Sequence, residues 1–505
     1  MKHNNRFIIA VLSAGILFSS CGKNFLDTNP TNKVPEDQVF NTVENAQTVL
    51  NGTWAYMMDN YLGGTFSNPG YGAILRVSDA MGSDVAVTTK YGFRDAYTFT
   101  EMIDNTKGRV AAFWTTLYKV IDNCNNVIAR IDGINGDETQ KKYIKGQALA
   151  LRANSYLVLA TFYQFNYSVN TSSKVVPIYL EPATAATAGK PKATVQQLYD
   201  QIIADLTEAE KLLPGFDRGE GRRFKMNLDV VEGLFARTYL NMGNWTKAGE
   251  KAAAARAAYT LMSAAEYAKG FNDVNNVEWI WGHPQTPSQR VASDNFHFLD
   301  VSSPSSGYYS FMADPYFKDL FTSNDIRFKL FAWDTLPSRE GLLRYEKFKF
   351  RADQTGDIVL MRAAEMYLIE AEAYARNGNI GKAAERLNDL RGARSAVLYK
   401  AAGQTIKQAV DTILVERRKE LWGEGFSLSD ILRTSGTVVR KAFVQANGDP
   451  IVIKVPRANG GFVSVNGKGH RAVKFPDGSA FVPNSKYYLF AIPDAEIKNN
   501  PNLDK

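Results

Sequence analysis

The sequence predicts a mostly α-helical fold, in which paired helices form a scaffold that carries long loops and a few short β-hairpins. Three observations lead to this prediction: a helical hairpin that occurs twice, further segments with helical spacing of apolar residues, and two segments without that spacing. The 505 residues, of which 45% are hydrophobic, are sufficient for a large buried core. This length is compatible with several domains of ~150 residues and equally with one continuous helical body.

The repeated hairpin consists of a helix, a Gly-Asn turn and a second helix. Small alanines at the contact positions allow the two helices of a pair to pack closely, and the glycine permits a left-handed turn between them. The repeated positions are Ala236, Tyr239, Gly243, Asn244, Lys247 and Ala248, which recur with the same spacing as Ala371, Tyr374, Gly378, Asn379, Lys382 and Ala383. This pattern resembles a tetratricopeptide helical hairpin.

Helical spacing of apolar residues also extends over segments outside the repeat. The helices expected there are Glu44–Asp59, Trp114–Ile131, Tyr143–Phe165, Val195–Leu213 and Thr405–Trp422. The two copies of the hairpin are too far apart in the sequence for a plain solenoid, so long insertions must pack onto the hairpins. We therefore expect a helical scaffold over about residues 35–260 and 355–435.

Two segments lack helical periodicity. Residues from about 272 to 343 mix aromatic residues with proline, serine and glycine, which predicts long loops and short helices on the ligand-facing side of the scaffold. Residues from about 441 to 483 alternate between apolar and polar side chains and contain Asn447-Gly448, Asn466-Gly467 and Asp477-Gly478. These dipeptides favour the positive φ angles of tight hairpins, so we expect several short strands in this hairpin-rich segment.

The N-terminus has the features of a secretory signal. Lys2 and Arg6 precede an uncharged run over residues 7–20, and Cys21 follows. This run is shorter than the roughly 20 apolar residues of a membrane-spanning helix, so residues 1–20 are predicted to be a signal peptide. The stretch 17–21 resembles a bacterial lipobox, which implies lipidation of Cys21 and a membrane anchor without a transmembrane helix. The alternative is an ordinary signal peptide with an incidental cysteine.

The composition excludes several classes of function. The chain has two cysteines, and if Cys21 is acylated then Cys124 has no partner, which excludes a disulfide framework and any multi-cysteine metal site. We expect Cys124 to be a small buried apolar residue. The net charge of +7 is weak for this length, and no basic run is interleaved with aromatic residues, so nucleic acid is not an expected partner.

Clustered acids near the C-terminus could be mistaken for a catalytic or metal site. Glu416, Glu420 and Glu424 lie four residues apart and would share one face of a continued helix. Their basic neighbours, Arg417, Arg418, Lys419 and the later Arg433, indicate compensated ion pairs instead, because uncompensated clustered acids repel one another. Glu365 lies three residues after Arg362, so we expect these two side chains to form an ion pair as well.

No catalytic motif is visible, and the protein is predicted not to be an enzyme. The mature chain has three histidines, His283, His297 and His470, and none has a metal-ligand spacing or a nucleophile motif beside it. We expect no metal and no cofactor. A surface hydrolase that uses two carboxylates stays open as an alternative, because such a pair leaves no reliable trace in a sequence.

Aromatic and polar residues in two loop regions are the candidate ligand-binding site. A sugar ring stacks its C–H faces on aromatic side chains, and its hydroxyl groups pair with amide, carboxylate or guanidinium groups, so loops rich in both kinds suit a glycan. The candidates are Tyr71, Arg76, Asp79, Tyr91, Phe93, Trp279, Trp281, Asn295, His297, Tyr308 and Tyr309. The alternative is that these side chains fill a small core beneath the long loops.

Several motifs, in a fixed order, extend over nearly the whole mature chain. They include Phe25-Leu26-Asp27 after the anchor cysteine, Met361-Arg362-Ala363-Ala364-Glu365, Glu416-Arg417-Arg418-Lys419-Glu420-Leu421, and Asn500-Pro501-Asn502-Leu503 near the C-terminus. Together they resemble the SusD/RagB family of outer-membrane nutrient-binding lipoproteins. The resemblance implies one SusD-like domain over residues 21–505.

The resemblance also implies a function. It suggests a lipid-anchored protein, exposed on the cell surface at the outer membrane of a Gram-negative bacterium, that binds oligosaccharides and delivers them to a SusC-like TonB-dependent transporter. One alternative is a peptide-binding lipoprotein of the same family, of the RagB type. A further alternative is a helical-repeat adaptor that binds only protein.

Overall fold

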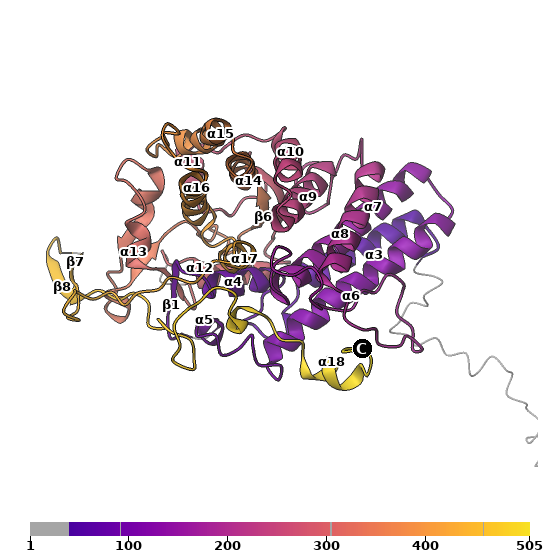
Figure 1. The fold of residues 1–505 in the computed structure, drawn as a ribbon, viewed down its shortest axis with the longest axis horizontal. Coiled ribbons are helices and arrows are strands. Elements are labelled where there is room, and N and C mark those ends of the chain that lie inside the picture. The colour runs from indigo at the N-terminus through magenta and orange to yellow at the C-terminus, as the bar shows by residue number, and fades with distance from the viewer. Residues whose placement is uncertain (1–39, 91, 303–305, 458) are drawn as a thin grey trace, which may run out of the picture.

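The computed structural model describes residues 40–505, apart from residues 91, 303–305 and 458 (Figure 1). The described chain is mostly helical and has a few small antiparallel sheets, which confirms the predicted fold class. The predicted signal peptide, Cys21 and Tyr91 lie outside the described residues. Within the described residues, none of the helices combines the length and the apolar composition required to cross a bilayer.

Four long helices form the N-terminal part of the scaffold: α3 (Val43–Met58), α6 (Gly108–Arg130), α7 (Glu138–Phe162) and α8 (Val195–Leu212). Helix α7 packs against both α6 and α8 and is buried along most of its length, so it forms the centre of this group. Polar caps set the helix starts: the Thr42 side chain accepts a hydrogen bond from Asn45 N, and Thr194 with Gln197 forms a capping box.

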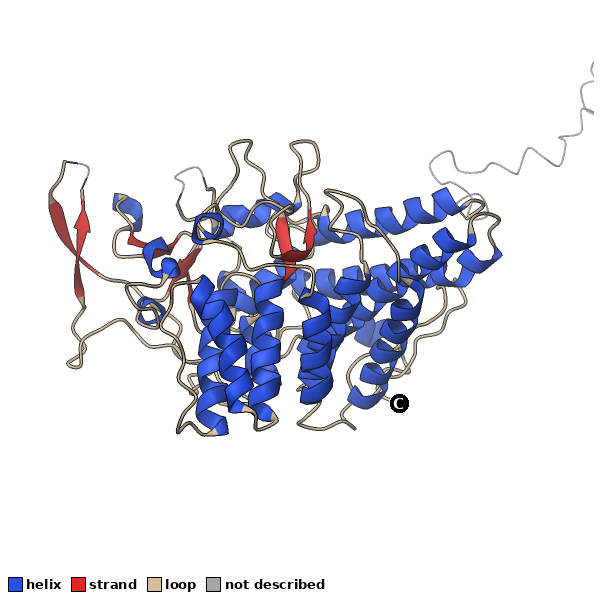
Figure 2. Cartoon of the chain, turned by 90° about the horizontal axis from the view of Figure 1, so that it is seen from above, coloured by secondary structure: helices blue, strands red, loops and turns tan. Residues whose placement is uncertain are grey.

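The two predicted hairpins are confirmed and lie side by side. The first is α9 (Leu228–Met242) with α10 (Trp245–Arg256), and the second is α14 (Ala363–Arg376) with α15 (Ile380–Ala393). Helix α10 packs against α14, so the copies are neighbours although they are distant in sequence (Figure 2). Gly243 and Gly378 have φ angles of 74° and 81°, the left-handed conformation that ends each first helix. Helix α16 (Ile406–Leu421) then packs against α14.

Shorter elements connect and cover this scaffold. The short α-helices are α4 (Gly72–Ala80), α5 (Arg94–Tyr97), α11 (Ala264–Tyr267), α12 (Phe296–Leu299), α13 (Pro315–Lys318), α17 (Ser427–Arg433) and α18 (Asp494–Asn499). The 3₁₀ helices are η3 (Leu62–Gly64), η4 (Ile131–Gly133), η5 (Ala292–Asn295), η6 (Ile326–Leu330), η7 (Pro337–Arg339) and η8 (Lys486–Tyr488).

Two small sheets run through the segment predicted to be loops and short helices. Strand β2 (Trp279–His283) pairs antiparallel with β6 (Ile358–Arg362), and a four-stranded sheet has the order β1 (Val85–Val87), β3 (Phe311–Ala313), β5 (Leu343–Tyr345) and β4 (Phe331–Trp333). Long loops and short helices were predicted for this segment, and the strands within it were not foreseen. All five residues of β2 are buried, so the strand lacks the apolar–polar alternation by which a half-buried strand is recognised.

A β-hairpin of strands β7 (Val452–Pro456) and β8 (Phe462–Asn466) projects from one end of the molecule (Figures 1 and 2). The short strands predicted here are present, and they pair as far as Pro456 and Phe462, beyond which Arg457 N donates to Gly461 O over 2.8 Å. Asn466 is the last residue of β8 and pairs with Val452, so Asn466-Gly467 does not connect the two strands. Asn447-Gly448 does lie in a tight turn, between the bridged residues Val444 and Pro450.

A network of buried ion pairs joins α16 to the hairpins and to β6. Glu420 accepts hydrogen bonds from Arg362 (2.7 Å), Arg394 (2.8 Å) and Arg327 (2.8 Å), and all of these side chains are fully buried. Burial alone would raise the pKa of Glu420, but the three guanidinium groups hold it well below its usual range. The prediction that these acids are compensated is confirmed. The expected partner of Glu365 was wrong, because Glu365 pairs with Arg237 at 2.7 Å.

The carboxyl group of Asp314 is an exception to this compensation. Burial and the charge of Asp84 raise the pKa of Asp314 to about 7, and its Oδ1 atom lies 3.9 Å from Nε2 of His470. Burial and Arg440 lower the pKa of His470 to about 3, so the ring stays neutral and does not compensate Asp314.

We expect the Asp314→Asn substitution to stabilise the protein at alkaline pH. Because the folded-state pKa of Asp314 is raised, the native state holds a proton that the unfolded state releases, so the stability of the wild type falls as pH rises from about 4 to 7. The variant should be more stable by on the order of 2 kcal/mol at pH 8, and this difference should vanish near pH 4. Urea unfolding at a series of pH values measures it. A constant difference at every pH would contradict this assignment.

Candidate functional site

Four of the predicted site residues are part of the core. Phe93, Trp279, Trp281 and Asn295 are at most 1% exposed. The indole nitrogen of Trp281 donates to Phe224 O over 3.1 Å, and Asn295 Nδ2 donates to Pro69 O over 2.8 Å. These side chains therefore have almost no surface to offer a ligand, and their visible role is to hold neighbouring segments together.

Three more predicted residues face inward: Arg76 and Asp79 on α4, and Tyr71 at its N-cap. Tyr71, Arg76 and Asp79 are at most 5% exposed. The Asp79 carboxylate accepts hydrogen bonds from Gly425 N (2.8 Å) and Ser427 Oγ (3.2 Å), and burial raises its pKa to about 6. Asp79 thus ties α4 to the segment that follows α16.

His297 and Tyr308 lie together at the surface, in a group that we call the aromatic patch: Tyr61, Phe66, His297, Tyr308 and Phe350. The Phe66 ring is 37% exposed and lies 5.4 Å from the ring of Tyr61, 6.0 Å from His297 and 5.8 Å from Tyr308, measured between centroids. Phe350 contacts His297 at 4.9 Å. The patch combines three segments that are far apart in the sequence, and it is open to solvent at Phe66.

Polar groups lie beside these rings. The Tyr61 hydroxyl donates a hydrogen bond to Asp294, and His297 Nε2 lies 3.6 Å from Asp294 Oδ1. Gly307 N donates to His297 Nδ1 over 3.1 Å, so Nε2 carries the ring proton and faces Asp294. Burial lowers the pKa of His297, which keeps the ring neutral at pH 7. The exposed guanidinium group of Arg290 lies near Asp294 and adds a cationic hydrogen-bond donor to the site.

The loop that carries Phe66 is held in place by the core residues beneath it. Tyr61 and Pro69 form an antiparallel bridge at the base of the loop, and Asn295 donates to the Pro69 carbonyl. Gly70 has a φ of 62°, and a Cβ atom there would lie 1.9 Å from the Met58 carbonyl oxygen, so only glycine fits. Asn295, predicted as a ligand contact, is therefore placed as a positioning residue beneath the patch.

Tyr309 lies next to the patch in the sequence but contacts other groups. The guanidinium of Arg339 lies 4.3 Å from the centroid of its ring, and Lys90 Nζ lies at 5.1 Å. Its φ angle of 31° is in the left-handed region, which is unusual for a tyrosine. The ring is half-buried between two cations rather than stacked with Tyr308.

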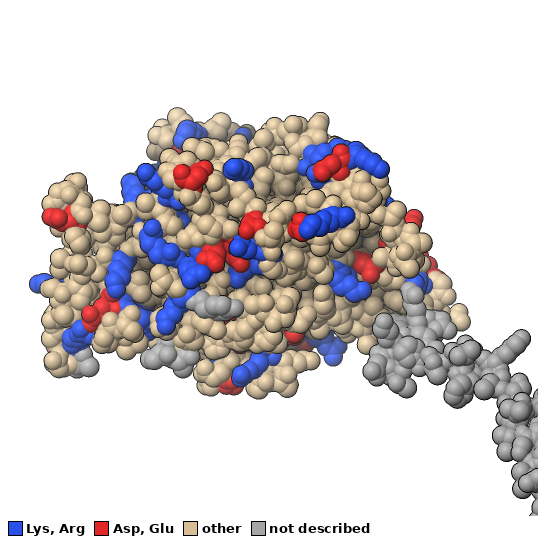
Figure 3. Space-filling model, turned by 90° about the horizontal axis from the view of Figure 1, so that it is seen from below, with Lys and Arg blue, Asp and Glu red and all other residues tan. Residues whose placement is uncertain are grey.

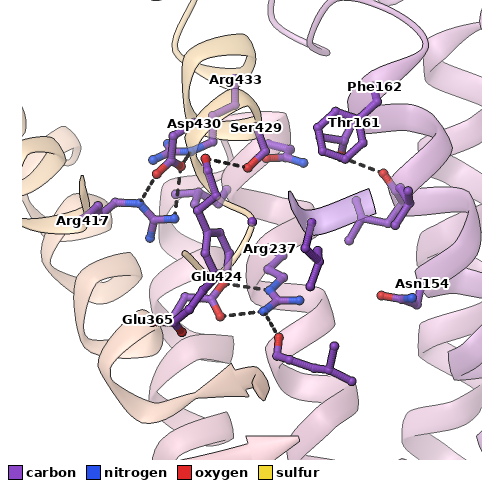
Figure 4. Close-up of a pocket in the computed structure, with 18 of the residues that line it drawn as sticks. Asn154, Thr161, Phe162, Arg237, Glu365, Arg417, Glu424, Ser429, Asp430 and Arg433 are labelled. Atoms are coloured by element: carbon purple, nitrogen blue, oxygen red, sulfur yellow. Dashed lines mark hydrogen bonds and ion pairs between the residues drawn. The ribbon is translucent and has the colours of Figure 1, made fainter. Parts of the chain in front are cut away.

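Tyr71 and Trp281 both line a cleft of about 90 Å³. Figure 4 labels the charged residues of this cleft. Its charged lining is paired: Asp430 accepts from Arg417 (2.9 Å) and Arg433 (2.6 Å), and Glu365 pairs with Arg237. A volume of this size holds several water molecules but not an oligosaccharide. The cleft is therefore a poor candidate for glycan binding.

Sequence reasoning missed Tyr61, Phe66 and Phe350. Phe66 stands alone among small polar residues in the segment 63–68, and nothing in that composition distinguishes it from a buried loop anchor. A cluster of histidine, cysteine and acidic side chains that could hold a metal ion does not occur among the described residues.

Comparisons with known proteins give consistent results. A SusD-like family model, described as starch-binding and associating with the outer membrane, matches residues 24–240, and the SusD family model matches residues 341–505. A SusD-like carbohydrate binding protein from Bacteroides vulgatus superposes with a TM-score of 0.86 at 43% identity, covering 92% of this chain and 98% of that chain. A putative sugar binding protein from the same species gives a TM-score of 0.74 at 25% identity with the same coverage.

Two curated proteins of Formosa agariphila are also similar. SusD-like protein P38 is 24% identical over 490 residues, which cover 85% of this chain and 91% of that protein. SusD-like protein P2 is 25% identical over 245 residues, which cover 47% of this chain and 44% of that protein. The chain thus spans less than half the length of one of these relatives and most of the other.

Proposed function

The chain belongs to the SusD family, and from this premise we propose that it is a nutrient-binding lipoprotein of the outer membrane that captures oligosaccharides at the aromatic patch. It passes them, chemically unchanged, to a SusC-like TonB-dependent transporter. Acylation of Cys21 tethers the protein to the outer membrane and leaves the helical body on the cell surface.

The exposed aromatic patch is the observation that carries this proposal. Phe66 presents a ring to solvent, and Tyr61, His297 and Tyr308 surround it within 6.0 Å, which gives a platform for the C–H faces of sugar rings. Asp294 and Arg290 lie at its edge, where they can accept from and donate to sugar hydroxyl groups. Because Asn295 and Gly70 fix the loop, the platform exists before the ligand arrives, and binding needs little ordering.

The predicted residues take different parts in this proposal. His297 and Tyr308 contact the ligand, and Tyr309 is proposed to flank the binding surface. Phe93, Trp279, Trp281, Tyr71, Arg76, Asp79 and Asn295 are buried and are not proposed to contact the ligand, and Asn295 holds the loop of Phe66 from beneath. Lys, Arg, Asp and Glu side chains are interspersed on the face shown in Figure 3, so no field of one sign there favours a charged polymer.

A binding screen separates this proposal from its rivals. The purified chain is titrated calorimetrically with a panel of neutral oligosaccharides and with peptides of equal size, and the recovered ligands are analysed by mass spectrometry. We expect binding to at least one oligosaccharide, with the ligand recovered intact. Binding to peptides alone would instead support the RagB type, and cleaved products would support the hydrolase. Capture of a transporter without any small ligand would support the adaptor.

A further inference from the structure

A cavity of about 330 Å³ opens between helix α6, the segment 179–189 and the C-terminal helix α18. We call it the α6–α18 cavity. Residues of the aromatic patch do not line it, and it is far larger than the cleft of Figure 4. Its volume is enough for one sugar ring or one amino acid side chain, and its lining combines aromatic rings with carboxylates.

Three aromatic rings form one wall. Trp114 and Tyr118 are one helical turn apart on α6 and therefore share a face, with centroids 4.6 Å apart. The ring of Tyr179, from the facing segment, meets Tyr118 edge-on at 5.9 Å. The faces of such rings are electron-rich and attract cations.

Three carboxylates complete the lining: Asp122, Glu181 and Glu496. Asp122 accepts from Ala183 N (2.8 Å) at one oxygen and from Lys119 Nζ (3.4 Å) at the other. Glu496 accepts from Asn500 (2.9 Å) at one oxygen, so its second oxygen and the Glu181 carboxylate face a ligand. Lysine and arginine are absent from the described lining. Nearby lysines partly offset this charge, since Lys119 lies 3.4 Å from Asp122, and Lys190 lies 5.4 Å from the centroid of the Tyr179 ring.

The walls are fixed by hydrogen bonds between the elements. The Tyr118 hydroxyl donates to Pro177 O over 2.8 Å, and Asn125 Nδ2 donates to Tyr179 O and Glu181 O, both over 3.1 Å. On the other side, Asn500 Nδ2 donates to Lys190 O over 2.9 Å. The segment 177–190 is thus tied both to α6 and to the C-terminal residues, and the cavity is formed without a ligand.

We propose that the α6–α18 cavity binds an organic ammonium group, carried by an amino sugar or by the amine of an amino acid or peptide. The aromatic wall attracts the cation, and the carboxylate oxygens of Glu181 and Glu496 accept hydrogen bonds from its N–H groups. A neutral ligand would bring no positive charge to these two carboxylates, whereas Asp122 is already paired with Lys119. This site lies apart from the aromatic patch, and the inference does not depend on glycan capture there.

Saturation-transfer NMR on the full chain tests the site with small probes. Glucosamine carries an ammonium group, and N-acetylglucosamine has the same ring without the charge. We expect glucosamine to bind at least tenfold more tightly than N-acetylglucosamine. Its affinity should fall as the salt concentration increases. Lysine amide distinguishes the two possible sources of the ammonium group. If lysine amide binds as tightly as glucosamine, the natural ligand is an amine of peptide origin. If it binds more weakly, the natural ligand is an amino sugar. Equal affinity for glucosamine and N-acetylglucosamine would overturn the proposal.

Isosteric variants locate the binding. The double variant Glu181→Gln and Glu496→Gln keeps the shape of the cavity but removes two charges, and it should weaken glucosamine binding at least tenfold. Asp494→Asn is the matched control, because Asp494 also lies on α18 but pairs with Lys498 at 2.6 Å outside the cavity. Phe66→Ala, in the aromatic patch, should leave glucosamine binding unchanged. Unchanged binding in the double variant, or equal loss in Phe66→Ala, would reject this site whatever the outcome of the oligosaccharide screen.

Discussion

Replacement of Arg362 by methionine is expected to lower the free energy of unfolding by about 3–5 kcal/mol. The Arg362 guanidinium is fully buried and bonds to Glu278 (2.5 Å), Glu420 (2.7 Å) and Glu424 (2.7 Å). Its removal leaves carboxylates in the core with fewer counterions, and the cost of a buried, uncompensated charge exceeds what the apolar methionine side chain gains. Urea unfolding followed by tryptophan fluorescence and by circular dichroism measures the loss.

Two further variants control this prediction. Arg362→Lys keeps a charge but cannot bond to several carboxylates in the fork geometry of a guanidinium, so its loss should be intermediate. Lys407→Met removes an ion pair of 2.6 Å on the surface, where the lysine side chain is 83% exposed, and should leave the stability nearly unchanged. If Arg362→Met unfolds at the same urea concentration as the wild type, the network does not stabilise the scaffold.

Phe66→Ala is expected to weaken oligosaccharide binding by about 10–100-fold, which corresponds to roughly 1.4–2.7 kcal/mol. Phe66 is the most exposed ring of the aromatic patch at 37%, and its removal takes away the stacking surface between Tyr61 and Tyr308. Unfolding should change little, because the ring is not in the core. Calorimetric titration with the oligosaccharide identified in the screen gives the dissociation constants of the wild type and of Phe66→Ala.

The matched control is Phe462→Ala on the projecting hairpin. Phe462 is 70% exposed and belongs to β8 of the projecting hairpin, which contains no residue of the patch (Figure 1). This substitution should leave the affinity for the oligosaccharide within twofold of the wild type. Equal affinities for the wild type and Phe66→Ala would remove the patch from the binding site.

The helical scaffold was predictable because its signals are local. The repeated turn glycines, Gly243 and Gly378, and the alanines that follow them specify each hairpin within about 30 residues. Helix α16, expected at 405–422, occurs at Ile406–Leu421, where Thr405 and Gln408 form a capping box. Spacing and caps of this kind need no knowledge of distant segments.

The partners of the buried charges were not predictable, although their compensation was. The basic residues next to Glu416 and Glu420 in the sequence suggested local pairs. Of these, Lys419 lies 3.8 Å from Glu416, but Arg417 pairs with Asp430 and Arg418 with Asp84. The contacts of Glu420 come instead from Arg327, Arg362 and Arg394, which are brought together only by the packing of the whole fold.

The residues of the candidate site that face solvent were not predictable from the sequence alone. Two segments rich in aromatic and polar residues were expected to supply it, and His297 and Tyr308 do lie at the surface together. Trp279 and Trp281 were expected in a loop, but they occupy β2, whose residues are covered on both faces. Composition alone cannot distinguish a ring that faces solvent from one that fills the core beneath it, because both require the same side chain.

A crystal structure of the chain with its best-binding oligosaccharide would show whether the aromatic patch is the binding site. We expect an intact oligosaccharide with a sugar ring stacked on Phe66, within contact distance of His297 and Tyr308. A ligand bound elsewhere on the chain, or one cleaved in the crystal, would contradict the claim that this helical body captures glycans at the aromatic patch and leaves them unchanged.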